Sequence, residues 1–190
     1  MRKSRRRGRR KILLRPILIL LMLALAAAAV ITGMDIGIRI AYPVAYSEYI
    51  VKYAHKYDLD KFLVMAVIKQ ESNFIPDAES DYAGGLMQLT EETAEWNAVQ
   101  MGLHNYSYMD PETNIKIGCH YLSYLIGHYG NIDTALAAYN GGMGNVDAWL
   151  ADSRYSSDGV TLDDIPFPET KAYVKKVNDY WRQYTEKYSQ

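Results

Sequence analysis

The stretch FLVMAVIKQES, residues 62–72, decides the fold of this 190-residue chain. Its first seven residues are all apolar, so a helix formed by them is hydrophobic on every side and belongs at the centre of a domain. Glu71 lies four residues after Val67 and eight after Leu63, on the same face of that helix. Its carboxylate is therefore expected to sit against the core rather than in water.

A carboxyl group in this position has unusual acidity. Burial disfavours the charged form and the negative end of the helix dipole disfavours it further, so the pKa of Glu71 is expected to rise. A carboxylic acid that keeps its proton near neutral pH can protonate a glycosidic oxygen. The alternative is that Glu71 ends its helix and turns into solvent, since glutamate is rarely buried without a partner.

Helix signals recur on both sides of this stretch. Asp58 or Asp60 can cap the helix that ends near Glu71, and Thr90 before two glutamates can start another. The sequence Asp110-Pro111-Glu112 is a strong helix start, and Gly130 supplies the stop. Further helices are predicted at 132–139, 146–150 and 168–188.

The last predicted helix is amphipathic, with Tyr173, Val177, Tyr180 and Tyr184 at i, i+4, i+7 and i+11. Alternation with a period of two is nowhere sustained, so an extensive sheet is not expected. Two long loops are predicted, an ordered one at 73–89 and a looser one at 151–167. The fold class is therefore predicted to be mainly α.

The charges are segregated along the chain. Residues 1–15 hold nine of the 21 basic residues and no acid, which leaves 12 basic and 22 acidic residues in the remainder, a net charge of −10. A globular part this acidic is a poor binder of nucleic acid. Cys119 has no cysteine partner, and the four histidines show no metal-binding spacing, so neither a metal nor a cofactor is expected.

An apolar run follows the basic tract. Residues 17–34 form 18 residues without a charge, just under the ~20 that cross a bilayer, and Arg15 can extend its charge to the interface. We predict a basic cytoplasmic segment at 1–15, a transmembrane anchor at 16–35, a linker at 36–46 and one outer domain at 47–190. That domain then faces the outer side of the cell membrane.

Two alternatives apply to this N-terminal segment. The alanines at 26–29 can hold a signal-peptidase site, and Arg9-Arg10 ahead of an apolar run has the form of a twin-arginine signal. Cleavage would release a secreted protein. The outer domain lies outside the cytoplasm in either case.

Five short motifs follow in order along the outer domain. They are QESNF at 70–74, PDA at 76–78, GLMQL at 85–89, AAYNGG at 137–142 and PETKAYV at 168–174. Together they resemble the soluble-lytic-transglycosylase family, whose domain has a lysozyme-like fold, and the resemblance runs from about residue 47 to 184. It implies a peptidoglycan lytic transglycosylase, a glycosidic-bond lyase of the bacterial cell wall that needs no cofactor.

The resemblance also assigns residues. It implies that Glu71 is the catalytic acid and base, which cuts the β-1,4 bond between N-acetylmuramic acid and N-acetylglucosamine and leaves 1,6-anhydromuramic acid ends. Six residues are implied at the bound glycan strand: Ser72, Met87, Gln88, Tyr139, Asn140 and Tyr173. Ser72 and Met87 suit ordinary packing positions equally well.

One departure from the family pattern lies just before Gly85. Four residues separate Ser80 from Gly85, where family members usually have five. A shift of the GLMQ backbone relative to Glu71 would slow the reaction, because small misplacements in an active site cost ~100-fold in rate. Gly84 and Gly85 can absorb the difference, since glycine adopts backbone angles that other residues avoid.

Two rival functions remain open. A hydrolytic muramidase on the same fold would use Asp77 or Asp81 as a second carboxylate that positions water. A catalytically inactive domain would bind glycan as a tethered scaffold. A third reading, a nucleotide site at Gly142-Met143-Gly144, fails because Asp147 stands where the fingerprint has its third glycine.

Overall fold

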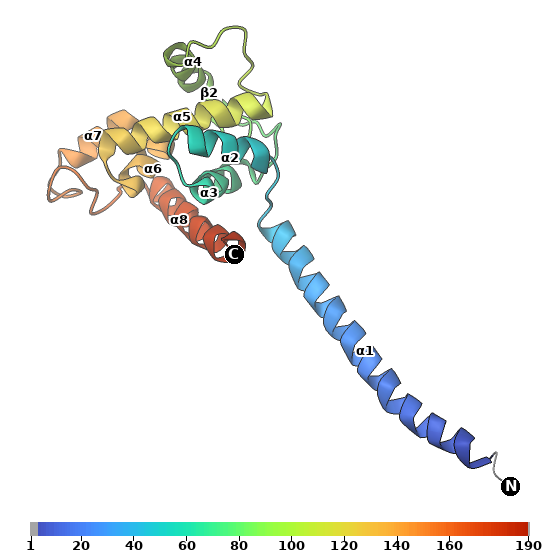
Figure 1. Cartoon of the computed structure of the whole chain (residues 1–190). Helices are drawn as coiled ribbons and strands as arrows, with labels where there is room; N and C mark the ends of the chain where they lie inside the picture. The colour runs from blue at the N-terminus through green and yellow to red at the C-terminus, as the bar shows by residue number, and fades with distance from the viewer. Residues whose placement is uncertain (1–3, 190) are drawn as a thin grey trace. The chain divides into compact units, whose positions relative to one another are not determined.

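The computed structural model describes the backbone of residues 4–189, with side chains at 19–34 and 36–189. It divides into two compact units, Met1–Pro43 and Val44–Gln190, which are considered separately (Figure 1).

The first unit is built on one helix, α1 (Ser4–Ala41). Its stretch Ile19–Ala41 has 23 residues and a mean hydropathy of 2.3, which is long and apolar enough to cross a bilayer. A signal sequence satisfies the same criterion. The helix runs through much of the linker expected at 36–46, because the first strong helix breaker after this apolar stretch is Pro43.

The second unit is mainly helical, as predicted. Its elements are α2 (Ser47–Lys56), α3 (Lys61–Ser72), β1 (Ala83–Gly84), β2 (Leu89–Thr90), α4 (Glu91–Gln100), α5 (Pro111–Tyr129), α6 (Ile132–Gly141), α7 (Met143–Leu150) and α8 (Pro168–Tyr188). Helix α2 was not among the predicted helices, and it begins at the first residue of the predicted outer domain. The two strands form one short antiparallel hairpin.

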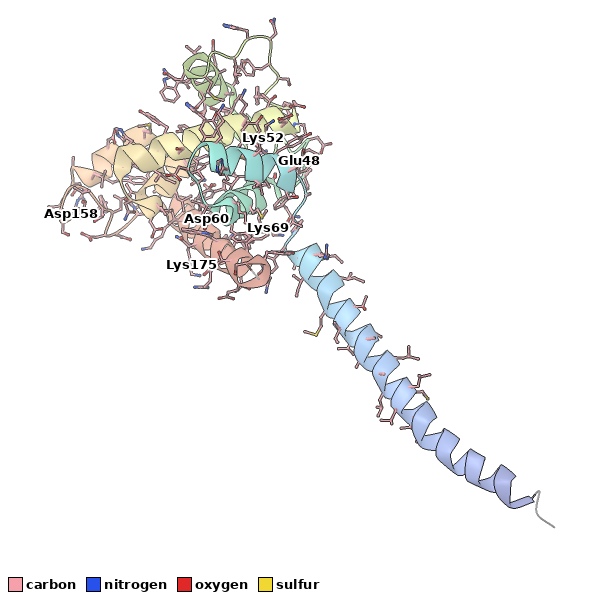
Figure 2. All side chains as sticks on the ribbon, viewed as in Figure 1. Glu48, Lys52, Asp60, Lys69, Asp158 and Lys175 are labelled. Carbon is pink, nitrogen blue, oxygen red and sulfur yellow. The ribbon has the colours of Figure 1, made fainter. Side chains whose placement is uncertain are left out.

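Local sequence signals set several helix ends. Asp60, rather than Asp58, caps α3 by accepting from the backbone N–H of Phe62 at 2.6 Å; Figure 2 labels it at the start of that helix. Thr90 caps α4 and Asp110 caps α5 in the same way. Gly130 ends α5 with a φ of 65°, a left-handed conformation that glycine adopts without strain.

Helix α3 forms the centre of the unit. Residues 62–68 are all at most 7% exposed, which confirms the expectation of a helix buried on every side. Helix α8 packs along α3 and α6, and α5 packs against α2, α4 and α6 (Figure 1). In α8, Tyr173, Val177 and Tyr184 are buried. The amphipathic stripe is therefore the surface that closes over α3.

The loop between α3 and α4 folds back on itself before the GLMQ motif. The N–H of Ser80 donates to the carbonyl of Ala83 at 2.9 Å, and the N–H of Gly85 donates to Ala78 at 2.8 Å. Gly85 has a φ of 78°. These contacts close the shortened segment into a tight turn, and one of the two glycines takes the backbone conformation that this turn requires.

Candidate active site

Glu71 lies in the last turn of α3 and is partly buried. Its Oε1 accepts a hydrogen bond from the hydroxyl of Tyr173 in α8 at 2.6 Å. Burial raises the pKa of Glu71 to about 7, and the hydrogen bond from Tyr173 opposes that rise. The rise in pKa expected from the sequence is thus present, and the carboxyl group is partly protonated at neutral pH.

Ser72, the next residue along α3, is buried in the core. It is 6% exposed, and its hydroxyl donates to the carbonyl oxygens of Leu86 at 2.8 Å and Ile68 at 3.2 Å. The residue therefore ties the end of α3 to the loop at 85–88, and its side chain has little surface for a sugar. The next residue, Asn73, ends the helix in a left-handed conformation.

Gln88, which the resemblance places at the bound glycan, braces the loop with its amide. Its Nε2 donates to the carbonyl oxygens of Ala78 and Gly85, both at 2.9 Å. The residue has a φ of 45°, a strained value for a side chain of this type. This strained backbone and the two amide contacts give the loop a defined shape beside the end of α3.

Met87 contributes to the loop through its backbone. Its carbonyl oxygen accepts from the hydroxyl of Tyr139 at 2.8 Å, and its N–H donates to Oδ1 of Asn114 at 2.7 Å. The side chain is fully buried against Gly118, where even one added methyl group would overlap the Met87 sulfur. The resemblance implies that this side chain contacts a sugar, but the side chain has no exposed surface. In the structure it packs in the core.

Asn114 is a site residue that the sequence analysis missed. It is fully buried in α5, and its Nδ2 donates to the carbonyl oxygens of Tyr108 at 2.7 Å and Gly84 at 3.1 Å. The Asn114 amide thus holds three backbone groups at or near the GLMQ loop: the N–H of Met87 and the carbonyl oxygens of Gly84 and Tyr108. An amide next to apolar Ile115 and Ile117 on a helix was the available signal, because buried polar groups need partners.

Tyr139 and Asn140, neighbours in α6, lie in different surroundings. The ring of Tyr139 is 5.4 Å from that of Tyr121, and burial together with the charge of Glu71 holds the pKa of Tyr139 well above its usual value. Tyr139 is thus close to the candidate catalytic group. Asn140 is exposed and lines a hollow with Phe167 and Pro168 at the start of α8.

The arrangement provides one carboxyl group that can both give and take a proton near neutral pH. Tyr173 orients it, and Ser72, Tyr139 and Asn114 hold the neighbouring loop. Among the described groups, no second carboxylate contributes to the pKa shift of Glu71. Among the side chains described, no cluster of three His, Cys, Asp or Glu could hold a metal ion.

The mainly helical domain belongs to the lysozyme-like class of folds. Residues 48–159 match the family model described as the transglycosylase SLT domain. The chain belongs to this family of lytic transglycosylases.

Several relatives are similar over most of this chain. It is 38% identical to the soluble lytic murein transglycosylase of Salmonella typhimurium, covering 73% of this chain and 23% of that protein. It is 32% identical to the membrane-bound lytic murein transglycosylase C of Serratia proteamaculans, covering 73% of this chain and 46% of that protein. The chain therefore spans less than half the length of these relatives.

Two solved structures share the fold. An inactive Glu-to-Gln mutant of the lytic transglycosylase Slt from Pseudomonas aeruginosa superposes with a TM-score of 0.70 at 33% identity, over 80% of this chain and 26% of that one. The 70 kDa soluble lytic transglycosylase of Escherichia coli gives 0.67 at 34% identity, over 76% of this chain and 25% of that one. The lysozyme-like helical fold expected from the sequence is thus confirmed.

Proposed function

We propose that this chain is a peptidoglycan lytic transglycosylase that cuts the β-1,4 bond between N-acetylmuramic acid and N-acetylglucosamine, with Glu71 as its acid and base. The observation that carries the proposal is the pKa of about 7 of this partly buried carboxyl group, in contact with the hydroxyl of Tyr173. At this pKa both the protonated and the ionised form are accessible at neutral pH, as two opposite proton transfers require.

In the first step the protonated Glu71 gives its proton to the glycosidic oxygen, and the bond from that oxygen to C1 of the muramic acid unit breaks. Positive charge develops at C1 as the N-acetylglucosamine unit leaves with the proton. Glu71 becomes a carboxylate, and the hydrogen bond from Tyr173 stabilises this ionised form.

In the second step the same carboxylate takes a proton from the C6 hydroxyl of the muramic acid unit, and O6 forms a bond to C1. The proton count closes, since Glu71 ends the cycle protonated and no water is consumed. One carboxyl group is enough for this sequence, whereas hydrolysis by the usual route needs a second one. Asp77 and Asp81, the residues considered for that second role, are both exposed.

The relatives support this assignment. The similar proteins of Salmonella typhimurium and Serratia proteamaculans are named as murein transglycosylases, and the Pseudomonas aeruginosa enzyme is inactive as a Glu-to-Gln mutant. Glu71 lies in the unit that is similar to these enzymes. Its pKa is raised, and the hydroxyl of Tyr173 donates a hydrogen bond to its carboxylate. The proposed site is then shaped mainly by residues that hold the GLMQ loop, namely Ser72, Met87, Gln88 and Tyr139. Asn140 is exposed to solvent, and Tyr173 contacts Glu71.

We further propose that residues 16–35 anchor the domain in the cell membrane, with residues 1–15 in the cytoplasm and the domain on the side of the wall. The apolar length of Ile19–Ala41 and the nine basic residues before it support this orientation. The test is the mass of the protein recovered from carbonate-washed membranes. The full mass in the membrane fraction supports an anchor, and a soluble protein shortened near residues 26–29 overturns it.

The function is tested by incubating the full chain, purified in detergent, with peptidoglycan and weighing the released fragments by mass spectrometry. We expect 1,6-anhydromuramic acid ends from the parent protein and no products from Glu71→Gln. Reducing ends would instead identify a hydrolytic muramidase. Binding without cleavage by the parent would identify a glycan-binding domain.

A further inference from the structure

A hollow of about 560 Å³ lies between α4 and the connection that leads from α4 to α5 (Figure 1). Its lining includes charged, phenolic and aliphatic side chains, namely Glu91, Glu95, Val99, Leu103, Tyr106 and Tyr108. Sites for small organic ligands have this size and this mixture of apolar surface with a few polar groups. None of these residues has a part in the proposed reaction.

Two carboxylates of this hollow come from one helix. Glu91 and Glu95 are one turn apart on the same face of α4, and both are exposed. Neither forms an ion pair with a basic side chain in the part of the chain that the structure describes. Like charges at this spacing repel each other, so a cation that lies between them would relieve the repulsion.

Tyr106 adds a third oxygen to the two carboxylates. Burial raises the pKa of Tyr106, and the charges of Glu95 and Glu91 raise it further, which requires that the three groups be close. A primary ammonium has three N–H donors and no acceptor, whereas carboxylate and phenol oxygens can all accept. The three side chains therefore match the donors of one ammonium group.

Aliphatic surface continues from these oxygens. Val99 is 72% exposed, and Leu103 is partly exposed in the same hollow. The methylene groups of an alkylammonium ion can cover this surface. A metal ion fits less well, because calcium takes about six to eight oxygen ligands and no group of three His, Cys, Asp or Glu lies together among the described side chains.

Hydrogen bonds hold the connection that forms the other wall. The N–H of Leu103 donates to the carbonyl of Ala98 at 2.9 Å, and Nδ2 of Asn114 donates to the carbonyl of Tyr108 at 2.7 Å. Ala98 is itself buried in α4. A ligand therefore does not have to order this segment, which lowers the cost of binding.

We propose that this hollow binds a primary ammonium group carried on an aliphatic chain, held by Glu91, Glu95 and Tyr106. Two sources have this chemistry: the side-chain amine of a diamino acid in a peptidoglycan stem peptide, and a free diamine. The first source rests on the proposed function, and the second does not.

The hollow is connected to the GLMQ loop through one side chain. Asn114, which holds the carbonyl of Tyr108, also accepts from the N–H of Met87 at 2.7 Å. A stem peptide bound in the hollow would thus lie against a segment that is bonded to the same amide as the loop next to Glu71. This contact favours an amine that belongs to the substrate over one from an unrelated molecule.

The first test is an NMR titration of the full chain in detergent with cadaverine, a diamine on a chain of five carbons. We expect a Kd on the order of 1 mM at low salt, and about tenfold weaker binding in either Glu91→Gln or Glu95→Gln. Glu92→Gln is the matched control, because Glu92 shares the first turn of α4 with Glu91 and does not line this hollow. Its affinity is expected to stay within about twofold.

This titration also identifies a merely general attraction of cations to an acidic domain. Equal losses of affinity in Glu91→Gln and Glu92→Gln, or no loss in Glu91→Gln and Glu95→Gln, would overturn the proposal. Both side chains are exposed, so neither change is expected to affect folding.

The second test distinguishes the two sources in the Glu71→Gln background. It compares a disaccharide tripeptide that ends in lysine with the same fragment acetylated on the lysine side-chain amine. Weaker binding after acetylation, with the difference lost in Glu95→Gln, identifies the stem-peptide amine. Equal binding of the two fragments, with cadaverine still bound, identifies a free diamine. Product analysis of the parent protein tests the proposed function separately.

Discussion

Two carboxyl groups in this domain each accept a hydrogen bond from a tyrosine hydroxyl, but their pKa values are shifted in opposite directions. Tyr173 donates to Glu71 at 2.6 Å, and Tyr53 donates to Glu112 at 2.8 Å. The pKa of Glu71 rises to about 7, whereas Lys52 and Tyr53 hold the pKa of Glu112 below its usual value. Figure 2 labels Lys52 on α2.

The surroundings explain this difference. The Glu112 side chain is 37% exposed and lies 2.6 Å from the Lys52 ammonium, so both water and a cation favour its charge. Glu71 is partly buried, and desolvation is the largest cause of its shift. A tyrosine hydroxyl alone therefore does not keep a carboxylate ionised. The comparison predicts that Glu71 acts as an acid and that Glu112 has a structural role.

The largest expected effect is on catalysis. Glu71→Gln removes the proton donor while keeping the shape of the side chain, so we expect the initial rate of glycan cleavage to fall about 1,000-fold or more. Glu112→Gln is the matched control and is expected to stay within about twofold, as is usual for exposed sites. Equal rates in the parent and Glu71→Gln would remove this residue from the mechanism.

The second effect is on stability and has opposite signs at the two positions. Since the folded pKa of Glu71 exceeds its ordinary value of 4.5, the folded state keeps a proton that the unfolded chain releases, and stability falls as pH rises from about 4.5 to about 7. Glutamine at position 71 has no such proton to release, so the stability of the variant does not fall in this way. Glu71→Gln is expected to exceed the parent by at most about 3 kcal/mol at pH 8 and to match it near pH 4, measured by urea unfolding.

Glu112→Gln is expected to show the reverse in the same urea experiment. Its lowered pKa means that the carboxylate stabilises the folded state above its unfolded pKa and loses that effect as pH falls. The variant is therefore expected to be less stable than the parent at pH 8, and the deficit should shrink towards pH 3. A pH dependence of the same sign at both positions would contradict the comparison.

Asn114→Ala tests whether the enclosure of Glu71 depends on the GLMQ loop. The change leaves the N–H of Met87 and the carbonyls of Gly84 and Tyr108 without their partner, at a cost of about 2 kcal/mol or more. A loosened loop admits water, so the pKa of Glu71 is expected to move back towards its ordinary value. An unchanged pKa, read by NMR titration, would mean that other elements enclose the carboxyl group.

The smallest expected effect distinguishes Tyr173, which contacts Glu71, from Tyr53, which contacts Glu112. The hydrogen bond of Tyr173 lowers the pKa of Glu71, so Tyr173→Phe is expected to raise it and shift the loss of activity at alkaline pH to higher pH. The rate is also expected to fall about tenfold, because the carboxyl group loses its orienting contact. Tyr53→Phe is expected to change neither quantity. An alkaline shift in the opposite direction would refute the assigned role of Tyr173.

The sequence predicted those features that depend on near neighbours along the chain. The caps at Asp60, Thr90 and Asp110 act within three residues, and the apolar run before Glu71 was enough to predict the raised pKa. These signals are local because capping and helix periodicity are local. The start of α2 was missed because Tyr46 precedes it without a side-chain cap.

The rest of the site depends on contacts between distant segments. Tyr173 is 102 residues from Glu71, and no local pattern in the sequence shows that they meet. Asn114 contacts groups 27 and 30 residues away, and no local pattern specifies them. The burial of Met87 likewise follows from the absence of a side chain at Gly118, which becomes visible only when α5 packs against the loop.

The central claim is tested most directly by titrating Glu71 itself. Carbon-13 NMR of the side-chain carboxyl group of the full chain, assigned by its loss in Glu71→Gln, reports its ionisation, and Glu112 serves as an internal reference. We predict a midpoint near pH 7 for Glu71 and a midpoint below the ordinary value of 4.5 for Glu112. A Glu71 midpoint near 4.5 would show a hydrated carboxylate without a proton to give at neutral pH, and would contradict the account.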